Sequence, residues 1–409
     1  MSRVSVLLLA PYLNGNGLGE VYSIFKWVQA LCEEADVTIL TVSGSGMEPL
    51  AQQLPKARVV ALIEPDILYN RFQRLNAMAK PYLPVFFHWA KRWIKQEMAS
   101  GTKFDIAHQI LPQAMRYTCP LKNLGLPYVV GPLGGSLDTP RAFRHEVQGG
   151  GIYTRLRNLD RPRLAYDPFL RAGYEQADVI LGVAPYIHDI LTEEKISVRR
   201  FEAVFERGHD GDMIELKRQD SSRQVQLLHV GRGIRTKGLR DVIRALAHLQ
   251  DLPEVTLVSA GDGEDLDACR AEADRLGLID RVTFLGRVPR EDVDRLYAQS
   301  DIFTFPSFRE PMGGVFFEAM GFGLPVITAA RGGPDFIIDD TCGIRVPVTT
   351  PDQFAIDIAD AVRQLTTDPE RRHALGRGAQ TRLATFGDWS EKALALVALY
   401  KDVLRTTTP

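Results

Sequence analysis

Cysteine is scarce in this chain. The 409 residues include only Cys32, Cys119, Cys269 and Cys342, and these four lie far apart. Structural zinc sites and disulfide frameworks are built from cysteines at characteristic spacings. The spacing here supports neither kind of site, and we therefore expect a reducing compartment.

Long apolar runs and an excess of one charge are also lacking. No apolar run approaches the roughly 20 residues of a membrane-spanning helix. The run at residues 4–10 is short, ends at Pro11 and is followed by glycines where a cleavage site would stand, so we expect a buried strand and not a secretory signal. The net charge is −2 and no aromatic-basic RNA motif is present, which disfavours a nucleic-acid partner.

Length and apolar pattern predict an α/β protein of two domains. A chain of 409 residues is too long for one ordinary core. Short apolar segments alternate with helical stretches, which predicts parallel sheets whose ligands bind at the carboxyl ends of the strands. We expect two Rossmann-like domains over 1–207 and 208–388, with a final amphipathic helix over 389–409.

Two carboxylates flank a pair of glycines in the C-terminal half. Glu310 and Glu318 are separated by seven residues, among them Gly313 and Gly314, and a helical apolar run begins after the glycines. A helix N-terminus offers unpaired N–H groups and about half a positive charge, so an anion can bind there. Carboxylates accept hydrogen bonds from hydroxyl groups. The pattern indicates a polyhydroxylated phosphate ester, whereas a helix cap and a surface acid are the alternative.

Two cations stand at the start of the second domain. A strand at 225–230 leads into GRGIRTKG, in which Arg232 and Lys237 precede a helix that begins near Leu239. A guanidinium can bind two phosphate oxygens, and an ammonium acts as a point charge. The pair predicts a diphosphate clamp, with ordinary surface charge as the alternative.

These motifs resemble the retaining glycosyltransferases of family 4, whose fold is called GT-B. The resemblance is carried by E-x7-E with its central glycines, by GLPVITAARGGP after it and by G-R-x4-K-G, and it covers most of the C-terminal half. It implies two domains facing each other across a cleft, with the C-terminal helix crossing back to the first. It also implies a UDP- or GDP-sugar donor on the second domain, a saccharide or lipid-linked acceptor on the first, and neither a metal nor another cofactor.

The resemblance also implies roles for single residues. Arg232 and Lys237 would bind the pyrophosphate, Glu318 the ribose hydroxyls and Glu310 the sugar hydroxyls. The donor-binding set is completed by Gly261, Val288, Met312, Gly313, Gly314 and Val315. Met312 departs from the pattern, since many members have an aromatic residue or glycine there, and this leaves the choice of donor open.

On the first domain, the resemblance places His108 close to the transferred sugar, because family members carry a histidine after D-x-x at this place. We expect it to act in catalysis with Arg232, Lys237 and Glu310, although a single histidine is more often structural. The loop GNGLG could suggest a dinucleotide site, but that fingerprint expects an acid at the end of the second strand. No acid stands there, which disfavours NAD binding. The expected acceptor side comprises Gly17, Gly19, Glu20, Gly134 and Gly135; for the last two a plain tight turn is the alternative.

The segment 67–96 is rich in cations and aromatic rings and contains no acid. Cations with large rings on helical stretches are what an interfacial membrane helix needs. The alternative is a helix pair packed on the first domain with a solvated basic face. Family members often use lipid-linked acceptors, which favours peripheral membrane contact, and we expect a cytoplasmic protein with the inner membrane face as the place of that contact.

We therefore expect a retaining glycosyltransferase of the hexosyltransferase type that acts in glycan, polysaccharide or glycolipid biosynthesis. Two alternatives stay open. One is a nucleotide-sugar epimerase of the same fold, and the other is a protein that binds nucleotide sugars without catalysis.

Overall fold

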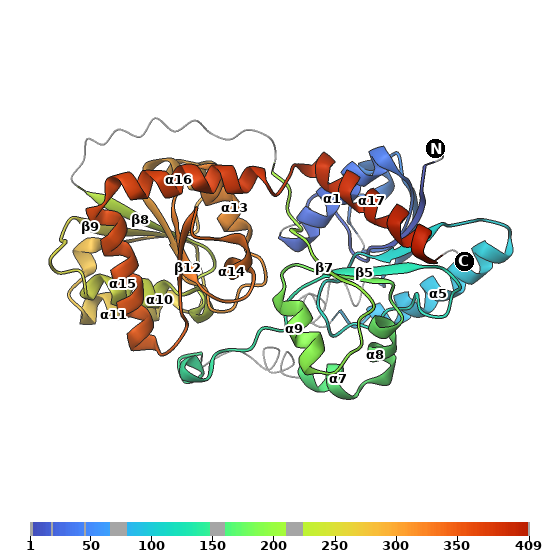
Figure 1. Cartoon of the computed structure of the whole chain (residues 1–409), viewed down its shortest axis with the longest axis horizontal. Helices are drawn as coiled ribbons and strands as arrows, with labels where there is room; N and C mark the ends of the chain where they lie inside the picture. The colour runs from blue at the N-terminus through green and yellow to red at the C-terminus, as the bar shows by residue number, and fades with distance from the viewer. Residues whose placement is uncertain are drawn as a thin grey trace. The chain divides into compact units, whose positions relative to one another are not determined.

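A computed structural model describes residues 3–17, 19–44, 46–65, 80–147, 160–209 and 224–407. The chain divides into two compact units (Figure 1). Unit 1 comprises Met1–Ser136, Gly150–Asp210 and Gly387–Pro409, and unit 2 comprises Leu137–Gly149 and Gly211–Phe386. Residues 137–149, which the sequence analysis assigned to the first domain, belong to unit 2 because Phe143 lies in the core of that unit.

Unit 1 is built on a parallel sheet with the strand order β3-β2-β1-β4-β5-β6-β7. The strands are β1 (Ser5–Leu9), β2 (Asp36–Ser43), β3 (Arg58–Ile63), β4 (Ile106–Gln109), β5 (Tyr128–Leu133), β6 (Val179–Gly182) and β7 (Phe201–Ala203). Its helices are α1 (Glu20–Glu34), α2 (Leu50–Gln53), α5 (Leu83–Ala99), α7 (Asp160–Tyr166), α8 (Pro168–Glu175), α9 (Tyr186–Glu193) and α17 (Trp389–Thr407). The central strands are buried on both faces, as their continuous apolar sequences predict.

The C-terminal helix α17 packs beside α1, as Figure 1 shows with the red and blue ribbons. Leu396 and Tyr400 of α17 are buried in the same core as Ile24 and Val28 of α1. The last helix of the chain is therefore part of the first unit, although the residues just before it belong to the second.

Unit 2 is a second parallel sheet with the order β10-β9-β8-β11-β12-β13. The strands are β8 (Val225–Val230), β9 (Val255–Ala260), β10 (Val282–Gly286), β11 (Ile302–Phe305), β12 (Val326–Ala329) and β13 (Gly343–Val346). Its helices are η1 (Arg141–Phe143), η3 (Arg235–Lys237), α10 (Leu239–Ala247), α11 (Leu266–Arg275), η4 (Ile279–Arg281), α12 (Arg290–Gln299), α13 (Gly314–Gly321), α14 (Gly333–Ile337), α15 (Pro351–Thr367) and α16 (Pro369–Ala384). Both units thus have the Rossmann-like arrangement that the alternating pattern predicts.

All four cysteines are free and buried. Within the described ranges, no helix combines the length and the apolar character that crossing a membrane requires.

Candidate active site

Two glycine loops meet at the carboxyl ends of β8 and β9. The N–H of Gly233 donates to the carbonyl of Asp262 (2.9 Å), and the N–H of Gly261 donates to the carbonyl of Gly286 (2.7 Å). Gly261 has φ +137°, and a Cβ added there would collide with the carbonyl oxygen of Gly231. The two backbones approach so closely that only glycine fits, which fixes the loop that carries the predicted cations.

Lys237 and Glu310 form a buried ion pair between that loop and the one after β11. The side chains are only 10% and 11% exposed, and the ammonium contacts Oε2 of Glu310. Arg232 lies on the same loop with its side chain exposed, and it forms no ion pair with any residue that the structure describes. The structure therefore brings Lys237 and Glu310 together and leaves the Arg232 guanidinium available to a ligand.

The glycines between the two acids form the N-terminus of α13. Gly313 has φ +91°, and a Cβ there would lie 2.9 Å from Cγ of Glu310. In the described chain, the amides of Gly313, Gly314 and Val315 donate to no other group, as at any uncapped helix start. These amides lie beside the Lys237–Glu310 pair. Met312 is 3% exposed, so its side chain packs in the core and only its backbone is left for a ligand.

Glu318 is held by two side chains from α12. Nη1 of Arg290 lies 2.9 Å from Oε1, and the hydroxyl of Tyr297 donates to Oε2 (3.2 Å). Burial alone would lower the pKa of the Arg290 guanidinium. The neighbouring carboxylates, Glu318 foremost, have the larger combined effect and raise that pKa. A lone carboxylate would be costly to bury in this apolar helix, and Arg290 and Tyr297 are partners that offset the cost.

Val288 lies in the loop between β10 and α12, half-buried, and its backbone N–H and C=O make no hydrogen bond within the described ranges. Main-chain groups of this kind can pair with the edge of a nucleobase. The assignment of Val288 to the donor site stays a prediction.

Sequence reasoning also missed an ionic cluster directly beside Lys237. The guanidinium of Arg235 is 4% exposed and donates to Asp241 (2.6 and 2.8 Å) and to Glu146 (2.8 Å). Burial opposes the charge of Arg235, but the two carboxylates outweigh it and raise its pKa. Asp241 stands among apolar residues of α10 and is fully buried. A buried acid requires a partner, so this position was the signal in the sequence that could have indicated the cluster.

His108, which we expected to act in catalysis, lies inside unit 1, and its catalytic role stays a prediction. The ring is completely buried, Nδ1 lies 2.6 Å from the hydroxyl of Tyr400, and Nε2 lies 2.6 Å from the carbonyl oxygen of Gly131. Burial lowers the pKa of the imidazole to about 4. Both ring nitrogens thus have partners within unit 1, and His108 joins α17 to β4 and β5.

The loops predicted for the acceptor side follow the carboxyl ends of β1 and β5, at one edge of the unit 1 sheet. Glu20 is exposed in the first turn of α1, which Gly19 precedes with φ +61°. Gly134 donates to the carbonyl of Gln113 (2.9 Å), and Gly135 has φ +86°. Gly17 closes a turn onto the carbonyl of Asn14 (3.1 Å). Acceptor binding by these loops stays a prediction.

The basic aromatic segment is described from residue 80 onward; residues 66–79 lie outside the described ranges. On α5, Phe86 and Phe87 are buried and Trp93 stacks with the guanidinium of Arg58 (5.4 Å). Phe86 and Phe87 therefore pack on unit 1, whereas Trp89 and Trp93 are half-buried, and membrane contact through this segment stays a prediction. Arg92 and Lys95 are exposed, so the helix presents a solvated basic face.

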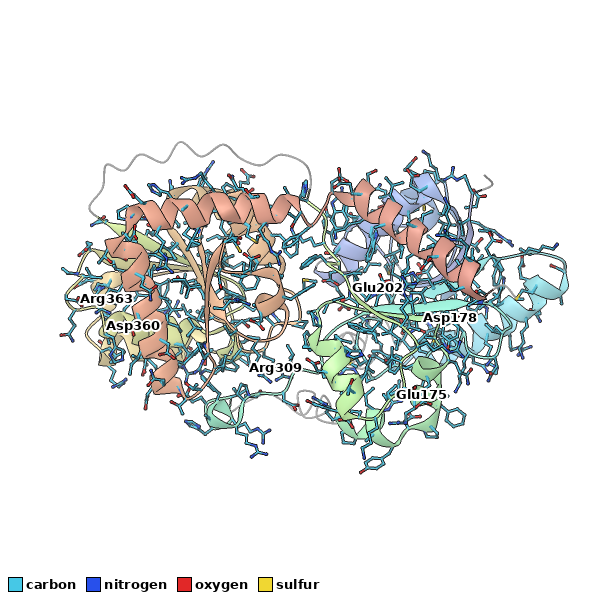
Figure 2. The ribbon with its side chains drawn as sticks, viewed as in Figure 1. Glu175, Asp178, Glu202, Arg309, Asp360 and Arg363 are labelled. Carbon is cyan, nitrogen blue, oxygen red and sulfur yellow. The ribbon has the colours of Figure 1, made fainter. Side chains whose placement is uncertain are left out.

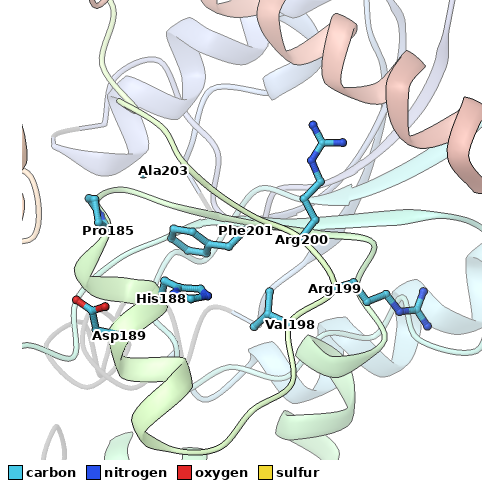
Figure 3. A pocket seen from close by; sticks show the side chains of 8 residues that line it. All are labelled: Pro185, His188, Asp189, Val198, Arg199, Arg200, Phe201 and Ala203. Carbon is cyan, nitrogen blue, oxygen red and sulfur yellow. The ribbon is translucent and has the colours of Figure 1, made fainter.

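A separate shallow pocket of about 500 Å³ lies between α9 and β7 in unit 1 (Figure 3). Its cations are already paired, since Arg199 contacts Asp178 (3.0 Å) and Arg200 contacts Asp402 (2.6 Å). None of the residues predicted for the site lines this pocket.

Comparison with known protein sequences gives three findings. Residues 214–382 match the family model "Glycosyl transferases group 1". N-acetyl-alpha-D-glucosaminyl L-malate synthase of Bacillus anthracis is 30% identical over 268 residues, which cover 62% of this chain and 68% of that protein. D-inositol 3-phosphate glycosyltransferase of Segniliparus rotundus is 32% identical over 192 residues, which cover 46% of this chain and 41% of that protein.

Among solved structures, Anabaena Alr3699/HepE in complex with UDP superposes with a TM-score of 0.66 at 16% identity. The match covers 98% of this chain and 100% of that one. Together with the two parallel sheets, this likeness confirms the expected GT-B fold class.

Proposed function

Because the chain belongs to the glycosyl transferases group 1 family, we propose that it transfers a sugar from a nucleoside-diphosphate sugar to an acceptor hydroxyl. The observation that carries this proposal is the buried Lys237–Glu310 pair beside the unpaired amides of α13. A cation, a carboxylate and a helix N-terminus supply what a phosphorylated sugar needs: positive charge for phosphate oxygens and an acceptor for sugar hydroxyls.

In this proposal the donor diphosphate is held by unit 2. Arg232, with its exposed guanidinium, binds two phosphate oxygens, and the amides of Gly313 to Val315 bind further ones. An ammonium has three donors, so Lys237 can keep its contact with Glu310 while it donates to a phosphate. These groups neutralise the charge that grows on the departing diphosphate, which is the largest catalytic contribution we assign and the reason that no metal ion is required.

The two acids then have separate roles. Glu310 orients the sugar hydroxyls beside the reacting carbon. Glu318 accepts hydrogen bonds from the ribose hydroxyls and keeps its contacts with Arg290 and Tyr297, since each carboxylate oxygen can accept more than one bond. Gly261 and the backbone of Val288 complete the nucleoside side.

For stereochemistry we propose retention, as in the family 4 enzymes that the motifs resemble. The acceptor hydroxyl attacks from the face that the diphosphate leaves, through an oxocarbenium-like state. A leaving phosphate oxygen takes the hydroxyl proton, so no protein base is needed. This route agrees with the buried position of His108, because it needs no histidine base.

On the acceptor we propose a saccharide or lipid-linked glycan bound by the loops of unit 1 after β1 and β5. Membrane contact through α5 would be electrostatic, through Arg92 and Lys95, because the large rings of this helix are buried or half-buried. The acceptor proposal rests on the exposed groups of the loops after β1 and β5. The membrane proposal rests on the basic and aromatic composition of residues 67–96.

The experiment is turnover with a panel of UDP- and GDP-sugars. A transferase without acceptor releases nucleotide slowly by hydrolysis, an epimerase forms a new nucleotide sugar, and a binding protein shows affinity without either product. The first outcome supports the proposal and the other two contradict it.

A matched pair of variants tests the ribose contact. Glu318→Ala should weaken binding of the turned-over donor at least tenfold, whereas Glu291→Ala, at an exposed acid on α12, should not. Unchanged affinity in Glu318→Ala would remove Glu318 from the site.

A further inference from the structure

A segment from the first half of the sequence is built into the donor unit. Residues 137–147, here called the strap, include the short turn η1, drawn in teal in Figure 1. Phe143 of the strap is completely buried, with its ring centroid 4.6 Å from that of Phe308 and 5.8 Å from that of Phe354. The strap therefore supplies a core side chain to unit 2.

The C-terminal end of the strap is fixed by charge. Glu146, whose side chain is 12% exposed, contacts Arg235 (2.5 Å) and Arg244 (2.9 Å). Burial opposes ionisation of Glu146, but the two arginines outweigh it and lower its pKa. Arg235 also lies over the rings of Phe143 (5.5 Å) and Phe308 (5.3 Å). One guanidinium thus joins the strap to the loop that carries Arg232 and Lys237.

The N-terminal end of the strap contacts the loop that carries Glu310. Nη1 of Arg331 donates to the carbonyl of Asp138 (2.7 Å) and to that of Phe308 (2.9 Å). Arg309, labelled in Figure 2, donates to the hydroxyl of Thr139 (3.5 Å). The strap therefore touches residues directly before Glu310 on one side.

Two further contacts connect the strap to the backbone of Glu310. A Cβ at Gly332 would lie 2.8 Å from Cδ1 of Leu137, and the N–H of Gly333 donates to the carbonyl of Glu310 (3.0 Å). The backbone of Glu310 is thereby held through neighbours that pack against the strap.

We propose that the strap is a positioning element of the donor site: it holds the loop 231–238 and the loop 308–313 in one arrangement. The argument is geometric, because Arg235 is two residues from Lys237, Phe308 is two residues from Glu310, and the strap contacts both. The effect on the donor rests on the proposed function, whereas the holding of the two loops does not.

The physical reason is that neither loop can fix itself. Glycine at 231, 233, 238 and 313 allows backbone freedom that packing must restrict. A buried guanidinium that contacts two acids and two rings has few alternative positions. Without the charge of Glu146, Arg235 keeps only Asp241 as an ion-pair partner among the described residues. The loop 231–238, which carries Arg235, should therefore become mobile first.

The test is amide hydrogen exchange without ligand in Glu146→Gln, read in peptides over 231–238 and 331–338. The second peptide contains the Gly333 amide that is bonded to Glu310. We expect at least tenfold faster exchange in both peptides and no change in α16. The control is Arg141→Ala, an exposed strap residue, which should exchange like the wild type.

Two exchange results would overturn the proposal. Unchanged exchange in both peptides of folded Glu146→Gln would show that the strap does not hold the loops. Equally faster exchange in α16 would show general destabilisation and no positioning. If Glu146→Gln does not fold, Phe143→Leu, which keeps an apolar side chain, is read by the same criteria.

Calorimetric titration with UDP and with GDP then tests the functional consequence. We expect the better nucleotide to bind Glu146→Gln about tenfold more weakly, with full stoichiometry of sites. An unchanged Kd with fewer active sites would contradict a positioning role. If the wild type binds neither nucleotide, the proposed function fails, while the exchange data still decide whether the strap holds the loops.

Discussion

Replacement of Lys237 by alanine separates its two effects, on stability and on turnover. In the structure its ammonium is the ion-pair partner of Glu310, and both side chains are about nine-tenths buried. Removing one partner of a buried pair leaves an uncompensated charge and costs on the order of 3–5 kcal/mol of folding free energy. Losing a cation that stabilises the leaving group costs about 10²–10³ in kcat. Lys237→Ala should show both losses.

The double variant Lys237→Ala/Glu310→Ala distinguishes the two effects. With both charges gone, no buried charge is left unpaired, so most of the lost stability should return. Turnover should not return, because the cation that we propose to bind the diphosphate is still absent and the proposed contact of Glu310 with the sugar is lost.

The assay is a double-mutant cycle in which urea unfolding and donor hydrolysis are measured on the same protein samples. We expect a favourable coupling energy in stability and no recovery of kcat in the double variant. Recovery of turnover together with stability would refute the reasoning, since it would mean that Lys237 only neutralises Glu310.

Three further predictions concern His108, Gly261 and the basic face of α5. Burial lowers the pKa of His108 from 6.5 to about 4, so between these values the unfolded state binds the extra proton and stability falls as the pH falls. From pH 7 to pH 5 the wild type should lose about 2 kcal/mol more than His108→Gln in urea unfolding, and an equal loss would contradict the burial of the ring. Gly261→Ala should lower the melting temperature of unit 2 more than Gly277→Ala, because both have positive φ but only the first meets a neighbouring backbone; equal shifts would disprove the close approach. Arg92→Glu with Lys95→Glu should abolish flotation on vesicles with anionic lipid, and unaltered flotation would exclude α5 as the contact.

The elements of the fold were predictable because their signals are local. Apolar runs such as 225–230 become parallel strands, and glycines such as Gly313 adopt the positive φ that a loop before a helix needs. Lys237 and Glu310 were both assigned to the donor site, and they lie side by side because both follow the carboxyl ends of parallel strands; their direct contact was not predicted.

Contacts between residues far apart in the sequence could not be predicted. His108 is buried by Tyr400, 292 positions away, and no local pattern reveals that partner. Arg235 and Glu146 are 89 positions apart, so the strap was read as part of the first domain. On α5, the aromatic and basic pattern fits both a membrane helix and a packed one; Phe86 and Phe87 are buried, which favours packing, and membrane contact stays a prediction.

The most direct test of the account is calorimetric titration of the wild type and of Arg232→Ala/Lys237→Ala with UDP and with GDP. The account predicts that one nucleotide binds the wild type and that the double variant binds it at least a hundredfold more weakly. The control Arg371→Ala, at an exposed cation of the same unit, should bind like the wild type. Equal affinity in the wild type and the double variant, or binding of neither nucleotide to the wild type, would contradict a diphosphate site in unit 2.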